Sequence, residues 1–155
     1  MVCDFFSIET ITSHQRVMLY DKKQLERLIP QRAPILMLDG IEAIEGETIH
    51  SVLTIAPDNF FLVGETLQEM ALIEHQAQTA SALAGHKALA TTDTAPIGMI
   101  GEVKNFVMQR LPKVGETLHT SVTFLDELGG ITLIKCTTLC QGEPVAETKM
   151  KIFVE

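Results

Sequence analysis

The stretch NFFLVGETLQEMALIEHQAQTASALAG, residues 59–85, carries an acid, Glu74, where a helical pattern calls for an apolar side chain. Counting in helical steps from Leu67 places Glu74 on a stripe that is otherwise mostly apolar. A carboxylate in such surroundings is costly unless it is hydrogen-bonded or protonated, which suits a group that exchanges protons. Glu74 is therefore our first candidate for acid–base chemistry.

Two neighbours of Glu74 could contribute to the same site. Gln78 lies one turn further along the helix and could hydrogen-bond the carboxylate. His75 follows directly, so its side chain points about a quarter-turn away, and both groups reach one site only if a substrate channel passes between them. Structural roles stay open for both residues. Glu74 could pair with a lysine or with Gln78 at a rim or dimer seam, and His75 could pack in the core or contact a partner.

The elements around this stretch predict one α+β domain. A capping box from Thr66 to Glu69 opens the helix, and Gly85 is a natural stop. A short helix that ends near Pro30 comes before it, followed by a hairpin of two strands, residues 35–44 and 48–55. After the helix, turn signals separate four extended segments. We predict an antiparallel sheet curled around a single long helix, with residues 21–155 as one domain and residues 1–20 as an N-terminal extension.

Composition excludes several classes of function. The chain has 155 residues, 46% of them hydrophobic, and a net charge of −8, which disfavours nucleic acid as a partner. No apolar run is long enough for a membrane span and no signal peptide is recognisable, so we expect a cytoplasmic protein with no membrane contact. Cys3, Cys136 and Cys140 lack the spacing of a disulfide framework or metal site, and we predict free thiols and no metal.

Three motifs then carry a resemblance that runs from about Leu25 to Glu155. The segments LIPQRAPILMLDGI, MALIEHQAQTASALAG and VKNFVMQRLPKVGETLHTSV occur in the order and spacing of 3-hydroxyacyl-(acyl-carrier-protein) dehydratases. The chain also resembles a divergent group of these proteins linked to aryl-polyene and other specialised lipid synthesis, which ALIEHQAQ fits at least as well. The resemblance implies a hot-dog fold and the elimination of water from a 3-hydroxyacyl thioester to give a 2-enoyl thioester.

The resemblance also implies partners. Such proteins are dimers with the acyl site at the subunit interface, so we expect a homodimer, with a heterodimer of two hot-dog subunits as an alternative. The substrate would be an acyl thioester on acyl carrier protein or coenzyme A. No bound cofactor is expected, because the pantetheine arm arrives with the substrate.

Carried over residue by residue, the resemblance places the catalytic acid at Glu74 and an orienting amide at Gln78. Backbone amides at the helix start, near Glu69, would polarise the thioester carbonyl. The histidine of the family falls at Phe60, which cannot transfer a proton. Asn59 could orient water or bind the thioester, although turn formation is the first role of such a residue.

The phenylalanine at this position leaves three interpretations. Another histidine could enter the site, Glu74 could act alone with water, or dehydration could have been lost while acyl binding or thioester hydrolysis remained. An acyl thioesterase and a catalytically inactive acyl-binding or partner subunit are therefore the alternatives to a dehydratase.

Overall fold

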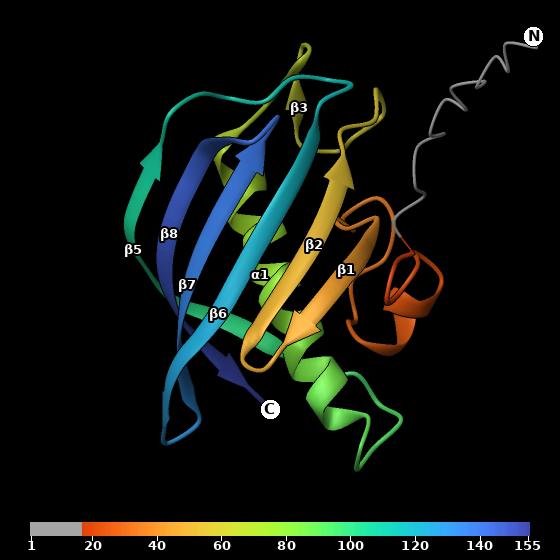
Figure 1. The fold of residues 1–155 in the computed structure, drawn as a ribbon, viewed down its shortest axis with the longest axis vertical. Coiled ribbons are helices and arrows are strands. Elements are labelled where there is room, and N and C mark those ends of the chain that lie inside the picture. Colours follow the sequence, from red (N-terminus) through yellow and green to blue (C-terminus); the bar gives the residue numbers. More distant parts are fainter. Residues whose placement is uncertain (1–16) are drawn as a thin grey trace, which may run out of the picture.

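The computed structural model describes residues 17–155. Its main feature is a six-stranded antiparallel sheet, in the order β1-β2-β6-β7-β8-β5, packed against one long helix, α1 (Figure 1). The strands are β1 (Gly40–Glu45), β2 (Thr48–Thr54), β5 (Gly98–Met108), β6 (Thr117–Leu128), β7 (Ile131–Cys140) and β8 (Glu143–Val154), with a two-stranded hairpin of β3 (Leu62–Val63) and β4 (Thr66–Leu67). The helices are α1 (Glu69–Ala88) and the short 3-10 helix η1 (Gln24–Arg27).

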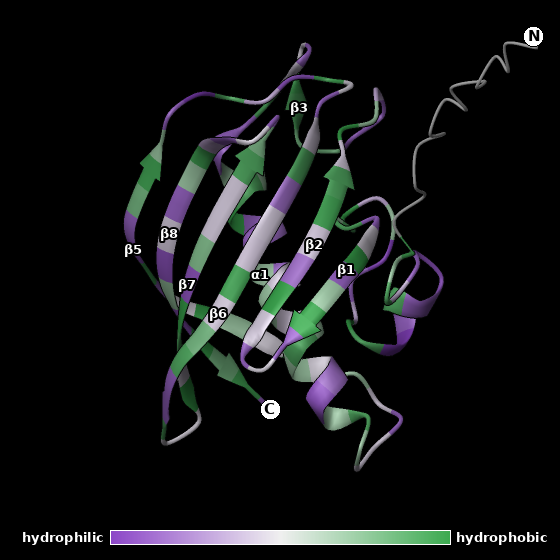
Figure 2. Ribbon diagram, viewed as in Figure 1, coloured by the Kyte–Doolittle hydropathy of each residue, from purple (hydrophilic) through white to green (hydrophobic). Residues whose placement is uncertain are grey.

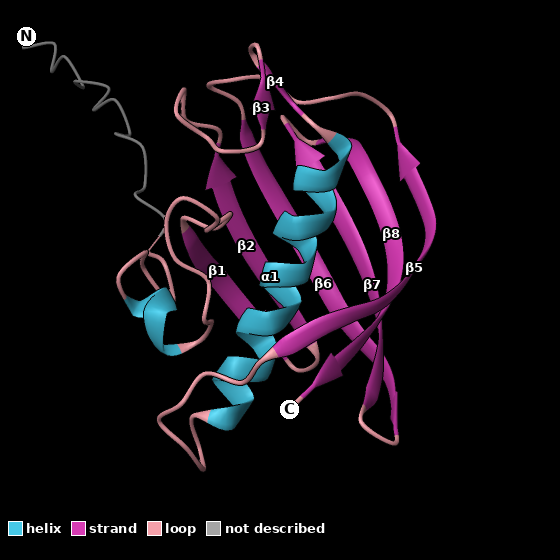
Figure 3. Cartoon of the chain, turned by 180° about the vertical axis from the view of Figure 1, so that it is seen from behind, coloured by secondary structure: helices cyan, strands magenta, loops and turns pink. Residues whose placement is uncertain are grey.

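Seen from behind, α1 crosses the face of the sheet (Figure 3). The edge strand β5 starts near the end of α1 and curves around the helix. This is the predicted α+β class and the hot-dog fold, with a curled sheet around one helix. The hairpin of β1 and β2 and the four later strands are confirmed, whereas the β3–β4 hairpin was not predicted.

Burial alternates along the strands, as expected for a sheet with one covered face. In β7 every second residue from Thr132 to Cys140 is buried, and Cys136 and Cys140 both point to the core side. Figure 2 shows apolar and polar bands alternating along the strands. Within residues 17–155 no helix is long and apolar enough to cross a membrane.

Two parts of the predicted secondary structure were wrong. A strand was expected over residues 35–44, but β1 begins only at Gly40. The backbone of Met37 explains the difference, because its N–H donates to the Gln78 side chain and its carbonyl accepts from His75. Backbone groups that are hydrogen-bonded to helix side chains cannot also pair with a neighbouring strand.

The predicted helix boundaries were also wrong. Thr66 belongs to β4, where it pairs with Val63, so α1 begins at Glu69 after an N-cap, Gln68, that makes no capping side-chain bond. Gly85 lies inside the helix, which continues to Ala88. A Cβ at Gly85 would lie 2.0 Å from the carbonyl oxygen of Leu28. Glycine at this position therefore allows the Leu28 backbone to pack against α1 and does not end the helix.

A polar layer lies between α1 and the sheet and separates two apolar clusters. One cluster gathers around Leu72 near the start of the helix, and the other around Leu83 near its end. The layer between them consists of His75, Gln76, Thr79, Ser51 (β2), Thr120 (β6) and Thr138 (β7), all buried. Their hydrogen bonds, which range from 2.7 to 3.0 Å between side chains, fix the rotation of α1 on the sheet.

We predict that Gly85→Ala lowers the free energy of unfolding by about 1–3 kcal/mol, because the added methyl group meets the Leu28 backbone. Helix propensity alone would raise stability by about 1 kcal/mol, so the sign of the change decides between the two effects. Urea unfolding of the variant beside the wild type measures it, and a more stable variant would contradict the assigned role of Gly85.

The buried ring of His75 predicts a dependence of stability on pH. Burial lowers its pKa from 6.5 to about 4, against the opposing effects of the Met37 carbonyl and the Asp39 charge. The unfolded chain therefore binds a proton between these values that the folded chain does not, and stability falls as pH drops from about 6.5 to 4.

The expected loss across this window is about 3 kcal/mol. Urea unfolding of the wild type and of His75→Gln at several pH values isolates it, because the carboxylates contribute equally to both series. The variant is expected to be less stable at pH 7 and to show a flatter profile. Parallel profiles would mean that His75 does not titrate in this way.

Candidate functional site

A small pocket lies beside α1, where the helix faces the beginning of β5 and the end of β8. Its volume is about 70 Å³. The lining residues are Gln31, Glu74, Ala77, Gln78, Ser81, Ala84, Gly98, Met99, Ile100, Ile152 and Val154. Of these, Glu74 is the one with an ionisable side chain, and aliphatic groups dominate the remaining wall. The single chain thus provides a carboxylate in an apolar recess that is smaller than the roughly 300–1,000 Å³ usual for ligand sites.

Glu74 is held by the neighbour that the sequence indicated. The Gln78 side-chain amide donates from Nε2 to Glu74 Oε1 at 2.6 Å. Within the described chain we find no other hydrogen bond or ion pair to this carboxylate, so Oε2 remains for a ligand. A lysine partner for Glu74, which the sequence left open, is not found within residues 17–155.

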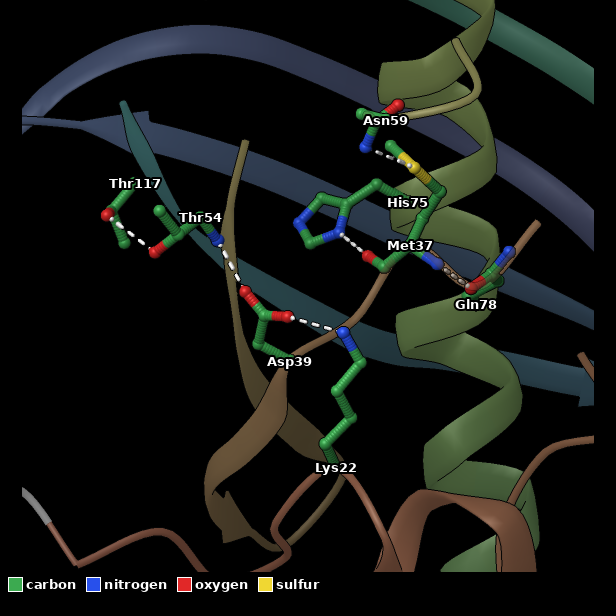
Figure 4. A network of polar contacts seen from close by, with 8 residues as sticks. All are labelled: Lys22, Met37, Asp39, Thr54, Asn59, His75, Gln78 and Thr117. Atoms are coloured by element: carbon green, nitrogen blue, oxygen red, sulfur yellow. Dashed lines mark hydrogen bonds and ion pairs between the residues drawn. The ribbon is translucent and has the colours of Figure 1, made fainter. Parts of the chain in front are cut away.

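The orientation of the Gln78 amide is set by the loop that precedes β1. Its Oε1 accepts from the Met37 N–H at 2.7 Å, and its Nε2 also donates to the Ile35 carbonyl at 2.9 Å. A backbone N–H can only donate, so the amide oxygen must face Met37 and the NH₂ group must face Glu74. Figure 4 shows Met37 lying between Gln78 and His75.

His75 does not share this pocket. Its ring is fully buried against the sheet, with Nδ1 2.7 Å from the Met37 carbonyl and Nε2 2.8 Å from Thr120 Oγ1. The pKa of about 4 makes it a neutral ring at pH 7. The two groups therefore point to different sides of α1, and direct contact of His75 with a substrate in the Glu74 pocket is not supported by this geometry.

The other predicted site residues lie outside the pocket lining. Asn59 forms a turn, because its Oδ1 accepts from the Phe61 N–H at 2.9 Å, and its Nδ2 contacts Met37 Sδ at 3.3 Å. Phe60 follows it with a ring that is 60% exposed. Glu69 is exposed at the first turn of α1, where no side chain caps the helix. The structure thus brings together Glu74 and Gln78 and leaves these three residues apart from them.

Gln31 lines the pocket but was not proposed as a site residue from the sequence. Its side-chain Oε1 is buried and has no hydrogen-bond partner within the described residues. An unpaired buried acceptor is unfavourable, so a donor from a ligand or another subunit would stabilise it. The available signal in the sequence was the place of Gln31 within LIPQRAPILMLDGI, one of the three motifs that carry the resemblance.

Within residues 17–155, neither Cys136 nor Arg110 points to a second site. Burial raises the pKa of the Cys136 thiol to about 12, which makes a thiolate nucleophile there unfavourable. Among the described residues no three His, Cys, Asp or Glu side chains form a cluster that could hold a metal ion. Cys3 lies outside the described residues. Arg110 is paired with Glu116 through two hydrogen bonds of 2.9 Å, and these lower the pKa of Glu116.

Comparison with solved structures finds similar folds. A dehydratase heterocomplex, ApeI:P from Xenorhabdus doucetiae, matches with a TM-score of 0.78 at 18% identity, over 84% of this chain and 90% of that chain. An uncharacterised protein from Pyrococcus horikoshii matches with a TM-score of 0.63 at 15% identity, over 83% and 91% of the two chains. A hypothetical thioesterase with coenzyme A from Streptococcus pneumoniae gives 0.58 at 10% identity, over 74% and 84%. At these identities the likeness shows the fold.

The family is shown by the sequence. No curated protein matches the chain. The family model for ApeP-like proteins, described as ApeP dehydratase, matches residues 23–155, which include the pocket, the polar layer and all the strands. This range confirms the resemblance to hot-dog dehydratases linked to aryl-polyene synthesis, and the chain belongs to the ApeP-like dehydratase family.

Proposed function

We propose that the chain is a 3-hydroxyacyl thioester dehydratase in which Glu74 is the acid–base residue. The observation that carries the proposal is the placement of Glu74 as the ionisable side chain of an apolar pocket, with one oxygen held by Gln78. Membership of the ApeP-like dehydratase family supports the same reaction class.

One carboxylate can satisfy the proton balance of this reaction. Glu74 Oε2 takes the proton from the α-carbon, and the electron pair of the C–H bond forms the new C=C bond. The C–O bond to the 3-hydroxyl group breaks, and the departing oxygen takes the proton from Glu74 and leaves as water. The carboxylate is restored, and the product is the 2-enoyl thioester.

The start of α1 is suited to the thioester carbonyl. The first amides of a helix lack partners within the helix and lie at the positive end of its dipole. No side chain caps the first turn after Gln68, so amides near Glu69 can polarise a carbonyl oxygen. Acyl carrier protein or coenzyme A would bring the pantetheine arm, and no further cofactor is needed.

The free edge of the sheet supports dimerisation. β5 pairs with β8 on one side and with no other described strand. Four of its apolar side chains are exposed, namely Met99 at 54%, Ile100 at 40%, Val103 at 38% and Val107 at 52%. Because Met99 also lines the small pocket, a second subunit on β5 would extend the site as well as cover the edge. We propose a homodimer in which the acyl group lies along α1 at the interface.

A partner subunit is the alternative that the pocket itself favours. Glu74 has no histidine beside it in the pocket lining, and the position of the family histidine is occupied by the exposed Phe60. A second hot-dog chain could supply the missing group, as a heterodimer. The structural similarity to a dehydratase heterocomplex is consistent with such an assembly.

We predict that Glu74→Gln abolishes the interconversion of 3-hydroxyacyl and 2-enoyl thioesters. Loss of a general acid–base group should lower kcat by about 10²–10⁴-fold, while the amide preserves the shape of the side chain. The assay follows both reaction directions by mass spectrometry, with thioesters of acyl carrier protein and of coenzyme A. Glu127→Gln, an exposed change on β6, is the matched control and should retain full activity.

The products of this assay distinguish the candidate functions. Release of free thiol that depends on Glu74 would indicate a thioesterase and contradict the dehydratase. Activity that appears only when a second hot-dog subunit is added would establish the heterodimer. Retained acyl-thioester binding without turnover under either condition would leave the acyl-binding subunit as the function.

We further predict that Val103→Arg converts the homodimer into a monomer. Val103 lies in the middle of β5 with a 38% exposed side chain, and a charge there would have to be buried in the interface. Light scattering after size-exclusion chromatography should give the mass of one chain instead of two. Leu128→Arg, at an 81% exposed position on the far end of β6, should leave the dimer intact. A dimeric Val103→Arg would exclude β5 as the interface.

A further inference from the structure

The hydrogen bonds of the polar layer have a defined direction that begins with the tautomer of His75. The Met37 carbonyl can only accept, so the proton on the ring must be at Nδ1. A neutral ring carries one N–H, which leaves Nε2 as an acceptor. Thr120 therefore donates its hydroxyl proton to Nε2 across 2.8 Å.

The direction continues across the two neighbouring strands. Because the Thr120 proton is used toward His75, its oxygen must accept from the Thr138 hydroxyl, 2.8 Å away. Thr138 in turn accepts from Gln76 Nε2 at 3.0 Å. The chain of bonds thus begins on α1 at Gln76, whose Oε1 is buried and has no partner in the part of the molecule that the structure describes.

On the other side of His75 the same direction leads into the pocket. The Met37 residue accepts from the His75 ring through its carbonyl and donates through its N–H to Gln78 Oε1. Gln78 then donates to Glu74 Oε1 at 2.6 Å. Figure 4 shows the segment of this chain from His75 through Met37 to Gln78.

We infer that His75 is a positioning residue for Glu74, acting through the Met37 backbone and the Gln78 amide. Every donor in the chain points toward the carboxylate. In order, the groups are Gln76, Thr138, Thr120, His75, Met37, Gln78 and Glu74. The carbonyl and the N–H of Met37 belong to two different peptide groups, so the link at this residue is positional: His75 fixes the backbone of Met37, and its N–H orients the Gln78 amide toward Glu74.

This arrangement fixes both the place and the role of each carboxylate oxygen. Oε1 is kept as an acceptor of the Gln78 amide, and Oε2 is left for the proton that is transferred. His75 itself stays on the sheet side of α1 and does not touch the substrate. The inference rests on the proposed function, in which Glu74 exchanges protons with the acyl thioester.

Thr120 offers a test that leaves every pocket residue unchanged. Thr120→Val removes the donor to His75 with little change in volume, whereas Thr120→Ser keeps the hydroxyl group. Ser51→Ala is the matched control, because it removes a buried hydroxyl of the same helix–sheet interface that bonds Thr79 at 2.7 Å and lies outside the chain. Thr138→Val removes the hydroxyl that donates to Thr120, and it replaces Thr120→Val in the test if that variant does not fold.

The first readout is independent of activity. The carboxyl ¹³C resonance of Glu74, assigned by its disappearance in Glu74→Gln, should move in Thr120→Val and stay in place in Thr120→Ser and Ser51→Ala. Ring ¹⁵N shifts of the wild type should report a neutral His75 with the proton at Nδ1. A proton at Nε2 would overturn the inference, and so would a Glu74 carboxyl resonance that has the same shift in Thr120→Val as in the wild type.

The second readout is kinetic. Thr120→Val should lower kcat for dehydration about tenfold, the equivalent of about 1.4 kcal/mol, with little change in KM, and Thr120→Ser should restore it. Equal losses of kcat in Thr120→Val and Ser51→Ala would overturn the positioning role. If the wild type shows no dehydration, the proposed function fails, and the Glu74 resonance still decides whether His75 is coupled to the carboxylate.

Discussion

The site depends on one backbone segment, at Met37, held between two side chains of α1. His75 binds its carbonyl at 2.7 Å and Gln78 binds its N–H at 2.7 Å. These bonds fix the loop before β1 on the helix, and they also determine which end of the Gln78 amide faces Glu74. These two hydrogen bonds between loop and helix therefore hold Met37 out of strand pairing and set the environment of the carboxylate.

A polar layer in the middle of a small core is unfavourable unless its hydrogen bonds are complete. In this layer most groups are satisfied, and the exception is Gln76 Oε1, which has no hydrogen-bond partner within residues 17–155. An entirely apolar interface would bury α1 equally well but would leave its rotation loosely specified. Directional bonds from Thr120 of β6 and Thr138 of β7 select one rotation, and that rotation places Glu74 in the pocket beside β5 and β8.

Much of the fold followed from patterns within short stretches of sequence. Alternating residues and turn signals predicted β2 and the four later strands, because these patterns reflect a sheet with one buried face. The failures occurred where distant residues decide the structure. Nothing local shows that Met37 would give its backbone groups to the helix, or that Gly85 would accommodate the carbonyl of Leu28 instead of ending α1.

The site residues likewise divide into those that local sequence could predict and those that depend on distant residues. Glu74 and Gln78 could be paired from their spacing on one helix, because residues four apart share a face. The role of His75 could not be predicted from spacing, because its ring bonds Thr120 and a loop about 40 residues upstream. Spacing alone made His75 a candidate for the same channel as Glu74, whereas its two ring nitrogens bond the Met37 carbonyl of the loop and the Thr120 hydroxyl of β6.

The unpaired edge of the sheet, β5, lies next to the pocket in which Glu74 is the one ionisable residue. The recess beside Glu74 is bounded on one side by Met99 and Ile100, which belong to the unpaired strand β5. Its volume of about 70 Å³ is small for a ligand site. A subunit placed on β5 would add a wall to the recess and could bring a second proton-transferring group to it. In the proposed dimer, assembly and catalysis would thus be coupled through the same strand, because the chain that lies against β5 would complete the site.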